Sequence, residues 1–292
     1  MSDLSNDPPP QGPPPGRGAL PLPCRVARLV GRRRLRPGQI AVVRLYGMIS
    51  GGARSAEWVE TVRRLRTSPG VPAVVLDIDS PGGAAATSDY LYLALSRLAA
   101  DKPLVAHVRG TGASGSYLAA MAARRLIVAP AAIIGSIGVI SAGPRVPALL
   151  DRLGIRVEER RAGRLKGMGA PWREGTEEEG QREQALVDAF YDLFVDRVAA
   201  GRGLTRERVL ELATGEVWLG SQAVELGLAD ETGDLDRAIE VAAALAGVPA
   251  RAQPVRLRRP LVARLADRFA TRLAAEVVGE LEARLWSRGP HA

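Results

Sequence analysis

The sequence predicts an α/β layered fold with a largely parallel core sheet and a mainly helical C-terminal half. Between residues 40 and 128, apolar runs rich in β-branched residues alternate with segments of helical periodicity, and this alternation is typical of parallel sheets covered by helices. After Asp151 the pattern becomes mainly helical. The chain has 292 residues, of which 46% are hydrophobic, and this is sufficient for a large buried core.

The first half is expected to alternate strand and helix. Continuous apolar runs predict the strands, and apolar residues three or four positions apart predict the helices. The predicted strands are 40–47, 71–78, 103–108 and 126–128, and the predicted helices are 55–67, 87–100 and 114–123. The uncharged stretch 126–144 contains prolines and glycines, so it is interpreted as a strand, a turn and a second strand, not as a membrane span.

The second half is expected to be helical, with predicted helices at 176–200, 205–213, 221–226, 235–246 and 260–286. The first of these has three glutamates in its first turn, 177–179, which the helix dipole favours. We expect four parts along the chain: a disordered Pro-rich tail (1–18), a basic arm (19–38), the main folded domain (39–247) and a C-terminal tail with an amphipathic helix (248–292).

Composition and charge limit the classes of partner. Lysine and arginine exceed aspartate and glutamate by 40 − 32 = 8, which favours contact between the basic arm and an anionic membrane surface. A nucleic-acid partner is not expected, because the arginines are dispersed and aromatic residues make up only 4%. Cys24, His107 and His291 are too few for a cysteine- or histidine-based metal site. The sequence does not open with a secretory signal pattern. We therefore expect a cytoplasmic protein that can contact the membrane surface peripherally.

Three glycine-rich turns follow predicted strands, at 79–83, 110–115 and 135–138. The carboxyl ends of parallel strands meet at one edge of a sheet, so these turns are expected to form a ligand site; simple tight turns are the alternative interpretation. The predicted substrate-binding residues are small or apolar ones: Gly82, Gly112, Gly135 and Ile137. The bare GxGxxG spacing at 110–115 lacks the acidic residue that would bind a ribose, so neither a nucleotide nor another cofactor is expected.

Ser114 is the candidate nucleophile, because it stands at the start of a predicted helix, where N–H groups and the dipole stabilise an oxyanion. A histidine base is not convincing: His107 lies inside a predicted strand and is more simply a structural residue. Lysine can be the base once burial lowers its pKa, and the chain has two, Lys102 and Lys166. Lys102 lies at the wrong end of its strand. Lys166 is therefore the candidate base, with an exposed loop lysine as the alternative interpretation.

Six motifs occur in order between residues 40 and 246: IAVVRLYGMIS, DSPGG, GASGSYLAA, GSIGV, GRLKGMGAPWRE followed by TEEE, and GEVWLGSQAVELGLADETG. Together they resemble the signal peptide peptidase A (protease IV) family of Ser–Lys serine peptidases, in its half-length bacterial type without a transmembrane anchor. The resemblance implies a Clp protease/crotonase-like fold and hydrolysis of extended peptides such as remnant signal peptides. It also implies homo-oligomers, often octameric rings.

Residue by residue, the resemblance implies that Ser114 is the nucleophile and that Lys166, 166 − 114 = 52 positions later, is the general base. It further implies that Ser136 orients this lysine and that the N–H groups of Gly83 and Ser114 form the oxyanion hole. Three positions depart from the family motifs: Ser116, Leu165 and Gly167 stand where the family has glycine, tyrosine and serine.

Three alternatives remain open from the sequence. A crotonase-type acyl-CoA enzyme uses a similar fold, and there Ser114 and Lys166 would have no catalytic role. A non-catalytic, oligomeric, membrane-associated scaffold would keep the fold without turnover. A phage-type capsid-maturation peptidase shares turns similar to DSPGG.

Overall fold

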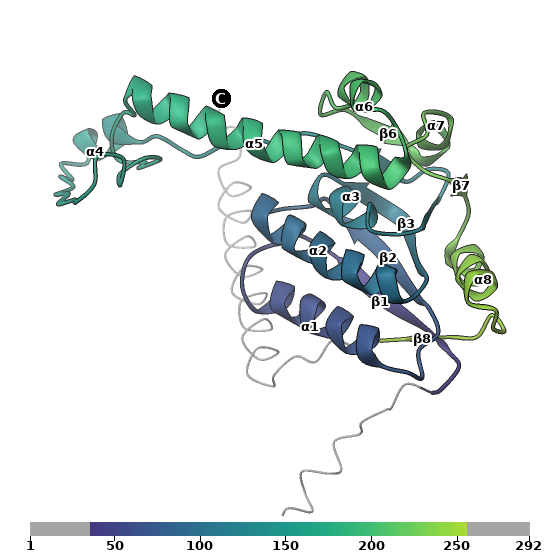
Figure 1. The fold of residues 1–292 in the computed structure, drawn as a ribbon. Coiled ribbons are helices and arrows are strands. Elements are labelled where there is room, and N and C mark those ends of the chain that lie inside the picture. Colours follow the sequence, from purple (N-terminus) through teal and green to yellow (C-terminus); the bar gives the residue numbers. More distant parts are fainter. Residues whose placement is uncertain (1–35, 256–292) are drawn as a thin grey trace, which may run out of the picture. The chain divides into compact units, whose positions relative to one another are not determined.

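The computed structural model describes residues 36–255 (Figure 1). The predicted Pro-rich tail, most of the basic arm, Cys24, His291 and the predicted helix at 260–286 lie outside the described residues. Within residues 36–255, no helix is both long and apolar enough to cross a membrane.

One sheet of eight strands organises the described part of the chain. Its centre consists of β1 (Ile40–Tyr46), β2 (Val74–Ser80) and β3 (Leu104–Ala113), which run parallel to one another. The outer strands are short: β4 (Arg125–Val128), β5 (Ile133–Gly135), β6 (Val217–Leu219), β7 (Glu231–Thr232) and β8 (Ala252–Pro254). Only the pairing of β5 with β6 is antiparallel, so the predicted largely parallel sheet is confirmed.

The two faces of the sheet are covered by different helices (Figure 1). On one face lie α1 (Ala53–Thr67), α2 (Ala85–Asp101) and α3 (Gly115–Ala120), and on the other lies α8 (Leu235–Ala246). The long helix α5 (Glu177–Arg202) contacts α3. The remaining helices are α4 (Pro147–Arg152), α6 (Arg206–Leu212) and α7 (Gly220–Glu225).

Alternating side chains of the strands build two cores, because successive residues of a strand point to opposite faces. Val43 and Leu76 pack under α1 and α2, whereas Val42 and Val75 pack under α8. Both faces are apolar, which explains why these strands appear in the sequence as continuous apolar runs and not as alternating ones.

The structure differs from the prediction in the short elements and in β3. The helix α4 and the strands β6, β7 and β8 have two to six residues each, too few for a periodic pattern to stand out. β3 continues five residues beyond Val108, so the predicted turn at 110–115 is largely strand. The helix α3 has six residues and is therefore shorter than the predicted helix 114–123.

β3 has two neighbours on the side away from β2. Its first half pairs with β4, at Val105–Val108, and its last residues pair with β5, at Thr111–Ala113. The register between β2 and β3 also shifts between Ile78 and Ser80. The carboxyl end of β3 is thereby carried past β4 to β5, and this is where the candidate site is built.

Candidate active site

Ser114 joins β3 to α3 in a backbone conformation that residues other than glycine rarely adopt, with φ 52° and ψ −126°. Its N–H donates to the Gly135 carbonyl at 2.8 Å, and its carbonyl accepts from the N–H of Leu118 at 2.9 Å. The residue is therefore held by β5 on one side and by the first turn of α3 on the other. Backbone strain of this kind costs about 1–3 kcal/mol and is concentrated at functional sites.

The DSPGG turn, whose first two residues end β2, lies against Ser114, and only glycine fits at its last two positions. Gly82 and Gly83 have φ of 93° and 153°. A Cβ on Gly83 would lie 2.0 Å from the Ile49 carbonyl oxygen, and one on Gly82 would lie 2.6 Å from the Gly115 nitrogen. The turn is fixed in place because Ile49 donates to the Gly82 carbonyl at 2.7 Å.

The N–H groups of Gly83 and Gly115 are open, since neither has an acceptor within residues 36–255. They are also close together: a Cβ built on Gly115 would lie 3.4 Å from the Gly83 nitrogen. The N–H of Ser114, expected as the second oxyanion donor, is instead bonded to Gly135. Two adjacent open donors can bind an oxygen that becomes negatively charged, so Gly83 and Gly115 form the better pair.

These residues line a groove with a volume of about 650 Å³. Much of its wall is apolar and comes from the segment after β1, from α3, from the loop after β5 and from α5: Met48, Leu118, Val139, Ile140, Phe190, Tyr191, Leu193 and Phe194. Of the predicted substrate-binding residues, Gly82 lines the groove. Gly112, Gly135 and Ile137 are buried and do not line it; Gly135, for example, lies against the Trp218 ring.

Ser136 lines the same groove as Ser114. It also has a positive φ, 51°, and its N–H donates to the Glu216 carbonyl at 2.6 Å. The antiparallel pairing of β5 with β6 therefore holds this half-buried serine at the groove.

Lys166 is not brought to Ser114 within one chain. It lies in a turn whose N–H donates to the Gly163 carbonyl at 3.2 Å, and its side chain is exposed. It is absent from the residues that line the groove. The pairing of Ser114 with Lys166 expected from the sequence therefore requires either a movement of this loop or a lysine from another copy of the chain.

Polar contacts tie the segment around Lys166 to α5. Arg173 pairs with Glu179 of α5 at 2.5 Å and donates to the Gly167 carbonyl at 2.7 Å. The hydrogen bond from Arg173, reinforced by the N–H of Thr176, lowers the pKa of Glu179 to about 2. Lys166 is thus presented on a loop that is anchored to the first turn of α5.

Lys102, the other lysine, is structural. It follows α2, and its Nζ donates to the carbonyls of Leu65, at 2.8 Å, and Ser68, at the end of α1. Burial of the amine lowers its pKa, but it is committed to capping α1, which agrees with the interpretation from the sequence.

His107 is a buried strand residue, as expected. Its Nδ1 lies 2.9 Å from Asp77 Oδ1, and the same carboxylate accepts from Arg109 at 2.8 Å and from the Tyr46 hydroxyl. Burial of Asp77 acts to raise its pKa, but these hydrogen bonds outweigh burial and hold the pKa below its usual value. His107 does not line the groove that contains Ser114, so it is not positioned as the base.

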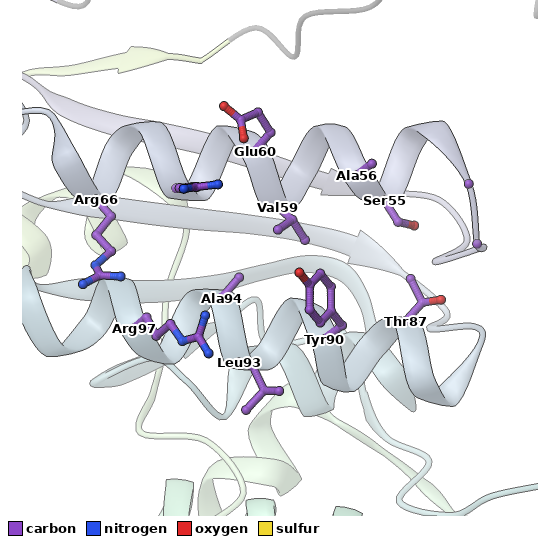
Figure 2. A pocket seen from close by; sticks show the side chains of 13 residues that line it. Ser55, Ala56, Val59, Glu60, Arg66, Thr87, Tyr90, Leu93, Ala94 and Arg97 are labelled. Atoms are coloured by element: carbon purple, nitrogen blue, oxygen red, sulfur yellow. The ribbon is translucent and has the colours of Figure 1, made fainter.

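A second groove, of about 700 Å³, lies between α1 and α2 (Figure 2). Tyr90 and Leu93 contribute its apolar surface, and Glu60, Arg66 and Arg97 contribute charge. None of the predicted catalytic residues lines it, so it is not the candidate active site. No cluster of three or more His, Cys, Asp or Glu side chains suited to a metal occurs in residues 36–255.

Sequence reasoning missed two kinds of site residue. The Gly115 N–H and the Glu216 carbonyl are backbone groups, and backbone groups leave no residue signature. The aromatic residues of α5 that line the groove, Phe190, Tyr191 and Phe194, belong to the helix that the sequence predicts at 176–200. That periodicity indicates an apolar helix face, but not which element the face packs against.

Comparison with known proteins shows that this chain is similar to a family of peptidases. Residues 96–249, more than half of the chain, match the family described as Peptidase family S49. The putative protease slr0021 of Synechocystis is 37% identical to this chain over 72% of this chain and 75% of its own length. The chloroplastic serine protease SPPA of Arabidopsis thaliana is 35% identical over 72% of this chain. The putative signal peptide peptidase SppA of Enterococcus faecium is 33% identical over 61% of this chain.

The matched regions differ in their share of each relative. The chain spans three quarters of the Synechocystis protein, 52% of the Enterococcus protein and only 33% of the Arabidopsis protein.

Proposed function

The chain belongs to peptidase family S49, with the Clp protease/crotonase-like fold of that family, and from this premise we propose that it is a serine endopeptidase with a Ser–Lys dyad. The observation that carries the proposal is the arrangement at Ser114. This strained serine stands in a groove beside two open N–H groups, those of Gly83 and Gly115.

The proposed reaction begins when neutral Lys166 takes the proton of the Ser114 hydroxyl while Oγ attacks the peptide carbonyl carbon. The carbonyl oxygen becomes an oxyanion and accepts hydrogen bonds from Gly83 and Gly115; one such donor is worth about 3–4 kcal/mol in the transition state. Lys166 then gives the proton to the leaving amine as the C–N bond breaks. A water molecule, deprotonated by Lys166, releases the acyl group and restores Ser114.

A second copy of the chain supplies Lys166 in this proposal. The lysine is exposed and lies outside the groove of its own chain, on a loop anchored to α5. Such a loop can reach the groove of a neighbour in a head-to-tail arrangement, which closes into a ring. The Ser136 hydroxyl, which lines the groove, is proposed to orient the arriving amine. The homo-oligomer is therefore part of the catalytic proposal.

The proposed substrates are extended peptides with apolar side chains. The groove beside Ser114 is walled by side chains such as Met48, Leu118 and Phe194, which favour apolar residues near the scissile bond. The Enterococcus relative is named as a putative signal peptide peptidase, which supports remnant signal peptides, apolar in their central region, as the substrate class.

The test uses two inactive variants, alone and together. We expect Ser114→Ala and Lys166→Ala each to lose hydrolysis of fluorescein-labelled casein by at least about 10³-fold. When both are co-expressed, a Ser114 from one copy can meet a Lys166 from its neighbour, so about a quarter of the wild-type activity should return in a ring of random composition.

Three results would count against the proposal. Full activity of either single variant removes that residue from the mechanism. A mixture that stays inactive rules out a dyad shared between copies. A fluorophosphonate probe that fails to label Ser114 in the wild type, while acyl-CoA is turned over, favours the crotonase-type alternative.

A further inference from the structure

We propose that Ser116 is a positioning residue: its buried hydroxyl ties the turn that carries Gly83 to the turn that carries Ser114. The inference rests on the proposed function, because it concerns the alignment of the oxyanion donors with the nucleophile. Ser116 is also one of the places where this chain departs from the motif it resembles, which has glycine there.

The contacts of Ser116 join two separate segments. Its Oγ lies 2.6 Å from the Ser80 carbonyl oxygen, 36 positions away in the chain, and 2.9 Å from the Ala113 carbonyl oxygen. The hydroxyl has a single proton, which it donates mainly to the nearer Ser80 carbonyl, with the Ala113 carbonyl as the second acceptor of a three-centre bond. Ser80 ends β2 and is the second residue of the DSPGG turn, whereas Ala113 immediately precedes Ser114. One side chain therefore holds both turns.

The bond lies where the regular pairing of β2 with β3 is interrupted. The register shifts between Ile78 and Ser80, so that Ser80 faces Gly112. At the irregularity, the N–H of Thr111 donates to the Asp79 carboxylate at 3.1 Å. Side-chain hydrogen bonds thus support the two strands where their regular ladder is broken, and Ser116 provides one of them.

Burial makes the contact specific. Ser116 is fully buried, so it is not accessible to a substrate and is not itself a candidate nucleophile. Removing its hydroxyl leaves the Ser80 carbonyl without that donor in a closed environment, where the bond cannot be exchanged freely for water. The turn that carries Gly83 can then shift relative to Ser114. A misplacement of reacting groups by about 1 Å can cost up to about 100-fold in rate.

The experiment compares Ser116→Ala and Ser116→Gly with the wild-type oligomer. We expect kcat for a quenched fluorescent peptide, chosen from the sites cleaved in casein, to fall about tenfold in both variants while KM changes less than about twofold. The labelling rate of Ser114 by a fluorophosphonate should fall in parallel. Ser116→Cys, which keeps a weak donor at the same position, should recover part of the rate.

Thr61→Val is the matched control. Thr61 is a buried hydroxyl residue of α1 that accepts from Arg64 and lines neither groove, so its loss should lower the melting temperature without lowering kcat. If Ser116→Ala and Ser116→Gly melt lower but keep wild-type kcat and labelling rate, Ser116 is merely structural and the inference is overturned. Ser114→Ala, measured alongside, separates the two proposals: turnover that persists there removes the nucleophile assignment and this inference with it. If Ser114→Ala is inactive and the Ser116 variants equal the wild type, only the role of Ser116 fails.

Discussion

Ser114 and Gly135 are joined by a hydrogen bond of 2.8 Å from the N–H of the serine to the carbonyl of the glycine. The bond continues the pairing of β3 with β5 to the candidate nucleophile. It fixes the serine backbone, and it removes the serine N–H from the set of donors that can bind a substrate. The open donor on this side is therefore the next residue, Gly115.

Replacing Gly83 by alanine is expected to destabilise the fold and abolish hydrolysis. The added Cβ would meet the Ile49 carbonyl oxygen at 2.0 Å, at a φ of 153°, so the turn must move. We expect a loss of about 2–4 kcal/mol in the free energy of unfolding, measured by urea denaturation. Gly51→Ala is the control, since its Cβ would have nothing within 4 Å; an equal loss there would contradict the steric explanation.

The strained backbone of Ser114 is expected to lower the stability of the folded protein. With φ at 52°, a residue with a Cβ costs about 1–2 kcal/mol more than glycine in this conformation. Ser114→Gly should therefore melt above Ser114→Ala, although both lack the nucleophile. Equal melting temperatures in differential scanning calorimetry would show that the backbone relaxes without cost.

The two lysines are expected to separate stability from catalysis. Lys102 caps α1 through the carbonyls of Leu65 and Ser68, so Lys102→Met should lower the free energy of unfolding by about 1–3 kcal/mol. Lys102→Met should leave casein hydrolysis per folded molecule unchanged. Lys166→Met should abolish casein hydrolysis and leave the free energy of unfolding unchanged. Loss of activity in a fully folded Lys102→Met protein would contradict this assignment.

The lowered pKa of Asp77 predicts how the free energy of unfolding depends on pH. Hydrogen bonds from His107, Tyr46 and Arg109 outweigh burial and hold its pKa below the usual value. A lowered pKa in the folded state means that the stabilisation is fully present above the pKa of the unfolded chain, about 4, and is lost as pH falls through the folded value. The stability difference between wild type and Asp77→Asn should therefore be constant from pH 8 down to about 5 and shrink below about 4.

The control for Asp77 is Asp101→Asn, which removes an exposed ion pair with Arg66. Its effect on the free energy of unfolding should stay below about 1 kcal/mol at every pH. A difference for Asp77→Asn that grows as the pH falls would reverse the predicted sign.

The sequence predicted helices and strands well where apolar residues repeat with a regular period. It did not predict the contacts of individual backbone groups at the site. The apolar runs of β1, β2 and β4 and the periodicity of α2 and α8 predicted those elements close to their observed bounds. Gly112 and Gly135 were expected to bind substrate, but in the structure they allow close packing against Val108 and Trp218. A glycine in a sequence indicates a close approach; it does not indicate what approaches.

By itself, the sequence determined the layered α/β fold, the parallel sheet and the small set of candidates for the chemistry, because apolar periodicity and residue type depend only on the order of residues. The tertiary structure decided which of those candidates meet. It brought Ser114, Gly83 and Ser136 to one groove, opened the N–H of Gly115 in place of that of Ser114, and left Lys166 on an exposed loop. The physical reason is that hydrogen-bond partners and distances arise from strand register and loop path, which join residues far apart in the chain.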